Sequence, residues 1–130
     1  MSRKTFLSVS AVVATAVGLF ALLAPAALLA SKGVSPSASA AVWVREVGVL
    51  LIALGTTAFL VRGESDSKSL RGFLFGNAIV HVGLLPIEIS AYSENVITRL
   101  AGIVPNSALH VLLAGGFLYF AVRIQIARLD

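Results

Sequence analysis

The residues of this chain that could do chemistry are ionisable side chains inside hydrophobic stretches: Glu46, His81, Glu88 and His110. A charge at bilayer depth costs roughly 2.5–3.5 kcal/mol on insertion scales, so a chain that keeps such residues usually pairs, hydrates or uses them. Carboxyl and imidazole groups are common general acids and bases. We therefore predict a site that binds a lipophilic small molecule. In a stronger form of this hypothesis the four residues are catalytic and move protons in an isomerisation, a cyclisation or an epoxide opening.

Three further polar residues are candidates for binding that substrate: Arg45, Asn77 and Asn106. Guanidinium and amide groups donate hydrogen bonds that can orient an oxygen atom of a ligand. Taken one by one, the same residues have structural explanations. Arg45 and Glu46 suit an ion pair at the membrane interface, and a histidine in a membrane helix suits an interhelical hydrogen bond.

The composition indicates that these residues lie in a membrane protein. Of 130 residues, 58% are hydrophobic and 12% are charged, whereas soluble domains average about 45–50% and about 25%. The basic residues, which give a net charge of +4, flank the apolar runs, so nucleic acid is not an expected partner. We predict a multi-pass protein of the cell's inner (plasma) membrane, with the lipid bilayer and a lipophilic small molecule as its partners.

Four apolar stretches are expected to position the polar residues. They cover residues 6–30, 40–61, 70–92 and 107–126. Each reaches the length of about 20 residues that a transmembrane helix needs. The whole chain, 1–130, is therefore expected to form one membrane domain, an all-α bundle of four transmembrane helices.

Local signals refine the ends of these helices. Asp66 or Ser67 is a suitable N-cap for the third helix, and the run from Pro105 to Ser107 is expected to cap the fourth. The first stretch also resembles a secretory signal peptide, because basic residues precede it and small residues end it. Its length favours a retained helix over that alternative, since signal-peptide cores are shorter.

The basic residues predict the orientation in the membrane. One side of a four-pass arrangement carries Arg3, Lys4, Arg62, Lys68, Arg71, Arg123 and Arg128. The other side carries Lys32 and Arg99, with Arg45 near that end of the second helix. Because Lys and Arg favour the cytoplasmic side, both termini are expected in the cytoplasm.

Helical geometry predicts where the polar residues meet. Counted at helical rise from the cytoplasmic ends, Arg45, Glu46, Glu88 and His110 reach one level in the outer half, and His81 lies about 5 Å deeper than His110. On the third helix Asn77, His81, Leu84 and Glu88 share one face, since their spacing is i, i+4, i+7 and i+11. We expect this face to line a polar pocket in the outer half of the bundle.

Glycines predict close packing and supply a second functional hypothesis. Gly72, Gly76 and Gly83 form a separate stripe on the third helix, and such residues let membrane helices approach closely. The chain could accordingly be a non-catalytic accessory or assembly subunit that docks a larger membrane complex or forms a homo-oligomer.

A third hypothesis is haem binding, with His81 and His110 as the two axial ligands of haem b in the helix bundle. The chain has no cysteine and no P-loop, dinucleotide fingerprint or zinc motif. The principal prediction is therefore a protein without a cofactor.

The first half of the chain also resembles a known group of proteins. It contains Gly18-Leu-Phe-Ala-Leu-Leu-Ala-Pro25, then Val44-Arg45-Glu46-Val47-Gly48 and Leu54-Gly55. These runs resemble small bacterial four-helix membrane proteins of the DoxX-like and related uncharacterised families, in which an Arg-x-x-Gly element opens the second helix. The resemblance implies a four-helix bundle and does not imply an activity.

Overall fold

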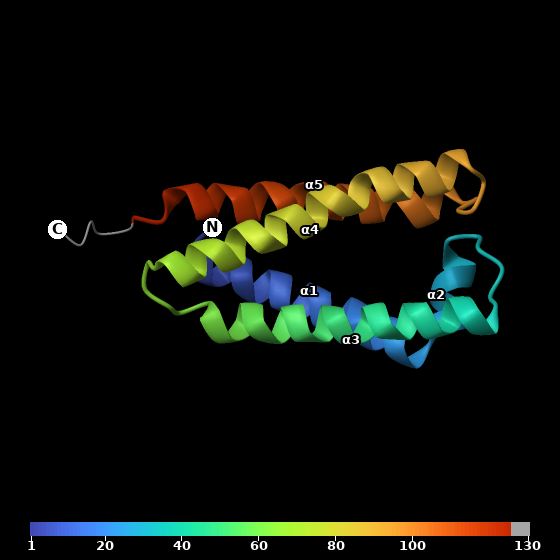
Figure 1. The fold of residues 1–130 in the computed structure, drawn as a ribbon, viewed down its shortest axis with the longest axis horizontal. Helices are drawn as coiled ribbons and strands as arrows, with labels where there is room; N and C mark the ends of the chain where they lie inside the picture. The colour runs from blue at the N-terminus through green and yellow to red at the C-terminus, as the bar shows by residue number, and fades with distance from the viewer. Residues whose placement is uncertain (126–130) are drawn as a thin grey trace.

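A computed structural model describes residues 1–125, and within this range the chain is all-helical, with no strand (Figure 1). The helices are α1 (Arg3–Leu23), α2 (Pro25–Ser31), α3 (Ala38–Val61), α4 (Lys68–Ser93) and α5 (Leu100–Arg123). All except α2 are long and apolar enough to cross a membrane. The prediction of an all-α chain with four candidate spans is confirmed at this level.

The first predicted helix is two helices, so the expectation of one helix over residues 6–30 is wrong. Helix α1 ends at Leu23, and Ala24 leaves the helical region with φ −133° and ψ 53°. The cause is Pro25, because the residue before a proline disfavours the α conformation, while proline itself suits the first position of a new helix. Helix α2 then carries the chain to Lys32, its C-cap.

The start of α5 also differs from the prediction. The helix begins at Leu100, and Pro105 lies inside it, so Asn106 and Ser107 are not caps. Pro105 has no backbone N–H to donate, and it lies within the first two turns of the helix. The side chains of Asn106 and Ser107 are therefore free to bind other groups. The predicted end at Ile126 lies outside the described residues.

The two middle helices agree closely with the prediction. Helices α3 and α4 begin two residues before the predicted 40 and 70, and they end within one residue of the predicted 61 and 92. Ser67 caps α4 as expected, since its hydroxyl accepts a hydrogen bond from the backbone N–H of Leu70 at 3.1 Å.

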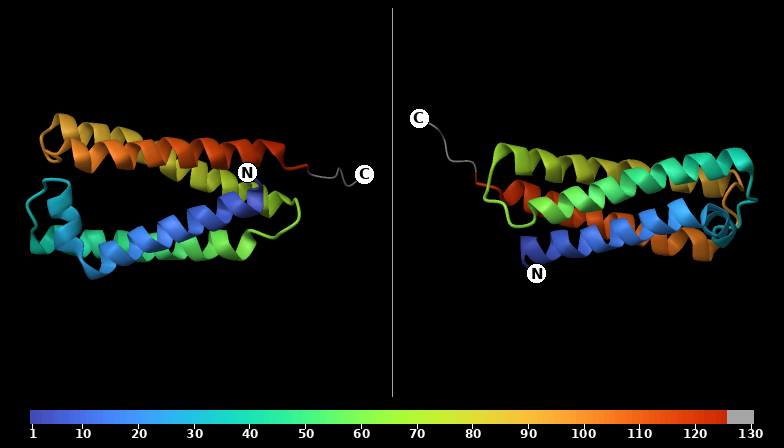
Figure 2. Two further views of the ribbon diagram at one scale, coloured as in Figure 1. Left: turned by 180° about the vertical axis from the view of Figure 1, so that it is seen from behind. Right: turned by 90° about the horizontal axis from the view of Figure 1, so that it is seen from below.

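The helices form two pairs, α1 with α3 and α4 with α5 (Figure 2). Glycines bring the first pair close together. A Cβ added at Gly18 would lie 2.8 Å from the carbonyl oxygen of Gly48, and a Cβ at Gly48 would lie 2.8 Å from that of Gly18. A Cβ at Gly55 would lie 2.9 Å from the oxygen of Ala11. These small residues allow the backbones to touch, as in other closely packed membrane helices.

The glycine stripe of α4 does not pack within the described chain, contrary to the prediction. A Cβ added at Gly72, Gly76 or Gly83 would meet nothing within 4 Å. Helix α4 instead turns Leu74 and Asn77 inward, where both are buried. Burial of the polar stripe leaves the glycines on the opposite, open face.

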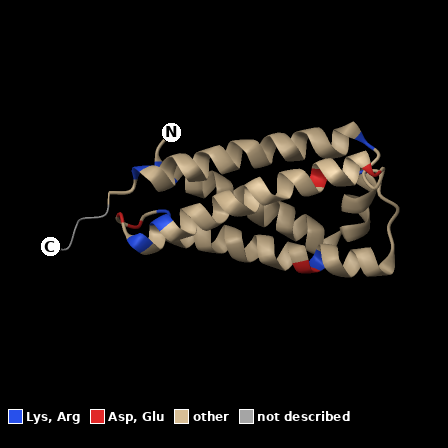
Figure 3. Ribbon diagram, turned by 45° about the horizontal axis from the view of Figure 1, so that its top comes forward, with Lys and Arg blue, Asp and Glu red and all other residues tan. Residues whose placement is uncertain are grey.

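The two pairs are joined at both ends and diverge toward the end that carries α2 (Figure 1). At the N-terminal end the rings of Phe6 and Phe117 pack edge to face with centroids 4.9 Å apart. At the opposite end the backbone oxygen of Lys32 accepts hydrogen bonds from the N–H groups of Thr98 and Arg99, at 3.2 and 3.3 Å. Most Lys and Arg residues gather at the N-terminal end (Figure 3).

A polar clasp centred on Asp66 also holds the N-terminal end. Its carboxylate pairs with the Arg3 guanidinium and accepts a hydrogen bond of 2.9 Å from the backbone N–H of Gln125. Arg3 donates a second bond, 2.7 Å long, to the backbone oxygen of Glu64. The clasp therefore ties α1, the α3–α4 loop and the end of α5 together.

We expect the clasp to make part of the free energy of unfolding depend on pH in the acid range. The Arg3 guanidinium, and then the Gln125 N–H, hold the pKa of the Asp66 carboxyl below its usual 3.8. A carboxyl group with a lowered pKa in the folded state stabilises the fold above its unfolded pKa, and this contribution is lost as pH falls through the folded pKa. Wild type should therefore melt above the Asp66→Asn variant at pH 7, and the gap should close below about pH 4.

Thermal melts in detergent, followed by the helical circular-dichroism signal, measure this gap. Glu94→Gln is the matched control, because the exposed Glu94 side chain bonds no residue in 1–125. A gap between wild type and Asp66→Asn that stays constant down to pH 2 would contradict the clasp.

Candidate ligand-binding site

A cavity of about 360 Å³ lies between the two helix pairs. This volume falls in the range of about 300–1,000 Å³ that is typical of small-molecule sites. Its apolar wall comes from all four long helices: Val13, Ala14, Val17, Ala21, Val44, Val47, Leu51, Leu54, Val80, Leu84, Leu109, Leu113 and Phe117. The polar groups that line it are few, and most of them form one connected chain.

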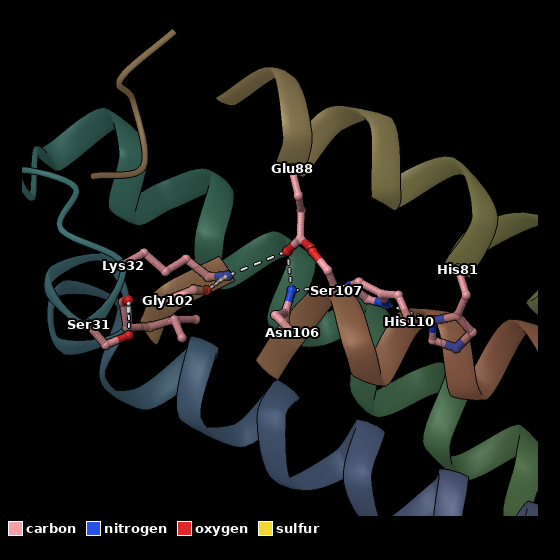
Figure 4. A network of polar contacts seen from close by, with 9 residues as sticks. Ser31, Lys32, His81, Glu88, Gly102, Asn106, Ser107 and His110 are labelled. Carbon is pink, nitrogen blue, oxygen red and sulfur yellow. Dashed lines mark hydrogen bonds and ion pairs between the residues drawn. The ribbon is translucent and has the colours of Figure 1, made fainter. Parts of the chain in front are cut away.

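That chain runs from Lys32 through Glu88, Asn106 and His110 to His81 (Figure 4). The break at Pro25 and the turn of α2 deliver Lys32 to the chain, while α4 and α5 deliver the other members. The polar stripe predicted on α4 is confirmed as a cavity wall, since Asn77, His81, Leu84 and Glu88 all line the cavity.

Glu88 is the anchor of this chain and is buried, with 8% of its surface exposed. One carboxylate oxygen, Oε1, accepts a hydrogen bond from Asn106 Nδ2 and lies 3.6 Å from Lys32 Nζ. The other, Oε2, accepts a 2.8 Å hydrogen bond from Ser107 Oγ. Lys32 Nζ also donates to the backbone oxygen of Gly102 at 3.2 Å. With both oxygens bonded to neighbouring side chains, Glu88 orients Asn106 and Ser107.

The two histidines are bonded to each other, and their protons can be assigned from chemistry. A carboxylate only accepts hydrogen bonds, so the amide group of Asn106 must present its NH₂ to Glu88. The same NH₂ lies 3.2 Å from Nε2 of His110, which must therefore accept and be unprotonated. His110 then carries its proton on Nδ1, which lies 2.9 Å from Nδ1 of His81. His81 accepts this bond, so its own proton is on Nε2.

Asn77 adds a second polar group beside His81 and is buried, with 6% of its surface exposed. Its Nδ2 donates a hydrogen bond of 2.9 Å to the backbone oxygen of Phe73. Because a carbonyl oxygen only accepts, this bond fixes the orientation of the amide group. The ring of His81, one turn further along α4, stacks on Phe117 with centroids 5.7 Å apart and an interplanar angle of 15°.

The structure does not bring Arg45 and Glu46 to the site, contrary to the prediction that Glu46 is catalytic and that Arg45 binds the substrate. Both side chains are exposed, and neither lines the cavity. Helix α3 turns Val44 and Val47 toward the cavity, and residues between these two positions point elsewhere at about 100° per residue. Within residues 1–125, neither Arg45 nor Glu46 has an ion-pair partner.

Sequence reasoning missed two members of the site, Lys32 and Ser107. In the sequence, Lys32 was used only to predict the orientation, and the signal that could have located it is Pro25, which ends α1 and redirects the chain. Ser107 had been assigned to a helix cap, and it became available once α5 began at Leu100. Asn106, predicted to bind substrate, lines the cavity and connects Glu88 to His110.

The residues present do not fit a bis-histidine haem. Axial ligands stand on opposite faces of the porphyrin, whereas the Nδ1 atoms of His81 and His110 are hydrogen-bonded directly to each other at 2.9 Å. Within residues 1–125 there is also no group of three or more His, Cys, Asp or Glu residues that could hold a metal ion. Instead, the hydrogen bonds that begin at Glu88 fix the tautomers of His110 and His81, so they determine which nitrogen of His81 carries its proton.

The fold and the site define a coarse class: an all-helical chain with four helices apolar enough to span a membrane and a largely apolar cavity between two helix pairs. Comparison with protein-family models, curated proteins and solved structures found no match to this chain. The resemblance to the DoxX-like families therefore stays a prediction, and a functional proposal must come from the site.

Proposed function

We propose that this chain is a multi-pass protein of the plasma membrane with four spans and both termini in the cytoplasm. Four long apolar helices support the spans, and the gathering of Lys and Arg at the N-terminal end supports the orientation (Figure 3). Arg128, which was counted for this orientation, lies outside the described residues. Helix α1 contributes Phe6 and Leu7 to the core and Ala14 to the cavity, which favours a retained helix.

Labelling tests the orientation, because the chain has no cysteine of its own. A membrane-impermeant maleimide should label Ser35→Cys in intact cells and should label Ser65→Cys only after permeabilisation. The reverse pattern would overturn the orientation.

We propose that the protein binds a lipophilic small molecule in the cavity between the helix pairs. The observation that carries this proposal is a cavity of about 360 Å³ with an apolar wall and one connected polar chain. An apolar wall favours burial of a hydrocarbon body, and a few fixed polar groups orient one end of the ligand. Both properties suit a molecule that dissolves in the bilayer.

The ligand would enter from the lipid, between α3 and α4. Three residues that line the cavity on these helices are also exposed: Trp43 at 68%, Val47 at 51% and Val80 at 37%. They mark a lateral opening whose rim is apolar. A molecule dissolved in the bilayer could pass this rim without crossing a charged surface.

We further propose a catalytic form of the same function, in which the bound molecule undergoes an isomerisation, a cyclisation or an epoxide opening. His81 would exchange the proton with the ligand, because its Nε2–H is the end of the polar chain. Glu88 and His110 would hold the tautomer of His81 and would be positioning residues. Loss of turnover in His81→Gln with binding retained supports this form, whereas unchanged turnover contradicts it.

Trp43 reports on binding, because it is the single tryptophan of the chain and lines the cavity. We expect bromododecane, whose bromine quenches tryptophan fluorescence on contact, to quench Trp43 with a saturable dependence on concentration. The matched control is Ala14→Phe, which fills the cavity from α1 and should leave only the non-saturable quenching of an exposed tryptophan. If the Ala14→Phe variant keeps its helicity and still shows saturable quenching as deep as that of the wild type, this result would contradict binding in the cavity.

A second candidate function is that of an accessory subunit, which the open glycine face of α4 favours. Gly72, Gly76 and Gly83 are exposed, and a Cβ at any of them would meet nothing within 4 Å. Such a face permits close approach of another membrane helix. Stoichiometric co-purification of a membrane protein, lost in a Gly76→Leu variant that remains helical, would support this candidate.

A further inference from the structure

We propose that the ligand of the cavity is a lipophilic alcohol whose hydroxyl group bridges His81 and Asn77. This inference rests on the proposed ligand-binding function and specifies the chemical class of the ligand. It follows from the hydrogen-bonding capacity that remains at the cavity wall once the internal bonds are assigned.

The donor at the cavity end of the polar chain is Nε2–H of His81. Glu88 fixes the direction of the Asn106 amide, Asn106 fixes the proton of His110, and His110 fixes that of His81. In residues 1–125, Nε2 of His81 has no hydrogen-bond partner, and it is not a fully buried unsatisfied atom. The ring lines the cavity, so this N–H is available to a ligand.

The acceptor nearest to His81 along α4 is Oδ1 of Asn77, on the same face of that helix. The bond from Nδ2 to the Phe73 oxygen directs Oδ1 away from the backbone, and Oδ1 has no partner in residues 1–125. Asn77 lines the cavity one turn from His81. The hydroxyl of Ser10, which also lines the cavity, donates its proton to the Phe6 oxygen at 2.9 Å, so Ser10 does not offer a second free donor.

A hydroxyl group satisfies both remaining groups at once. Side chains four apart on a helix are neighbours, with Cβ atoms about 5–6 Å apart, so one ligand oxygen between them is within reach of both side chains. The oxygen accepts from His81, and its proton goes to Asn77. An ether or a ketone can only accept, which leaves Asn77 without a donor.

Charged head groups fit this wall less well. A carboxylate would present only acceptors to Asn77, and Lys32, which lines the cavity, is already bonded to Glu88 and to the Gly102 oxygen. An ammonium group would present only donors to the N–H of His81. A neutral group that both donates and accepts is therefore the best match.

A matched dodecyl series tests the inference on the unmodified protein. Displacement of bromododecane from the cavity is followed by recovery of Trp43 fluorescence, with n-dodecanol, dodecyl methyl ether, dodecane and dodecanoate as competitors. We expect n-dodecanol to bind on the order of tenfold more tightly than the ether, because the ether leaves a buried acceptor unsatisfied. Dodecane and dodecanoate should bind more weakly than the alcohol.

Two variants test whether Asn77 causes the preference for the alcohol over the ether. Asn77→Ala should bind the alcohol and the ether within about twofold of each other, since the acceptor is gone. Glu46→Gln, an exposed residue outside the cavity, should keep the full preference. Equal binding of alcohol and ether by the unmodified protein, or tightest binding of dodecanoate, would overturn the inference and leave the ligand-binding proposal intact. Absence of saturable bromododecane quenching would instead defeat the ligand-binding proposal itself.

Discussion

Replacing Glu88 by leucine is expected to lower the free energy of unfolding by about 2 kcal/mol, because it removes a buried carboxylate and leaves the partly buried ammonium group of Lys32 without its ion-pair partner. The change removes the carboxylate that lies 3.6 Å from Lys32 Nζ and that accepts bonds from Asn106 and Ser107. Ser107 would lose its acceptor, whereas Asn106 would keep His110 and Lys32 would keep the Gly102 oxygen. Unfolding in mixed detergent, followed by circular dichroism, measures the loss.

Two variants separate charge from hydrogen bonding in this network. Glu88→Gln keeps an acceptor in place and should lose about 1 kcal/mol, less than Glu88→Leu. The double variant Lys32→Met with Glu88→Leu should be more stable than Glu88→Leu alone, since it leaves no unpaired ammonium. If Glu88→Leu unfolds at the denaturant concentration of the wild type, the polar chain does not hold the helix pairs together.

Replacing Gly48 by alanine is the second large expected effect, a loss of about 1–3 kcal/mol from overpacking. The new methyl group would lie 2.8 Å from the Gly18 oxygen and 2.9 Å from the Leu22 nitrogen. Both are backbone atoms, so α1 and α3 must move apart. The same unfolding measurement reports this loss.

Gly76→Ala is the matched control for this prediction, because the same added atom meets nothing within 4 Å. In an exposed helix position the exchange should be neutral or should stabilise the protein by up to about 1 kcal/mol. Equal losses in Gly48→Ala and Gly76→Ala would contradict the pairing of α1 with α3.

The sequence predicted the long helices well and failed at two prolines. Length and hydropathy suffice to locate apolar helices, and the bounds of α3 and α4 were close to the predicted ones. Pro25 ends α1 within a stretch that was predicted to be one helix. Pro105, which was predicted to lie before a helix, lies inside α5. Whether a proline ends a helix depends on the contacts of the neighbouring turns, which hydropathy does not report.

The sequence predicted which face of α4 lines the candidate site, but it did not predict how α3 is rotated relative to that site. Periodicity placed Asn77, His81 and Glu88 on one face of α4, and all three line the cavity. The rotation of α3 is set by Gly48 and Gly55, which face α1, and this contact leaves Arg45 and Glu46 exposed. The direction of each side chain of α3 depends on the partner helix, which the periodicity of a single helix does not report.

The most direct test of a ligand-binding cavity is native mass spectrometry of the protein purified from its own membrane. We expect the wild type to carry a neutral lipophilic molecule with a hydroxyl group, and we expect the cavity-filled Ala14→Phe variant to lack it. A stoichiometric protein partner without a bound small molecule would instead favour the accessory-subunit function. The same small molecule retained at equal occupancy in Ala14→Phe would contradict binding between the two helix pairs.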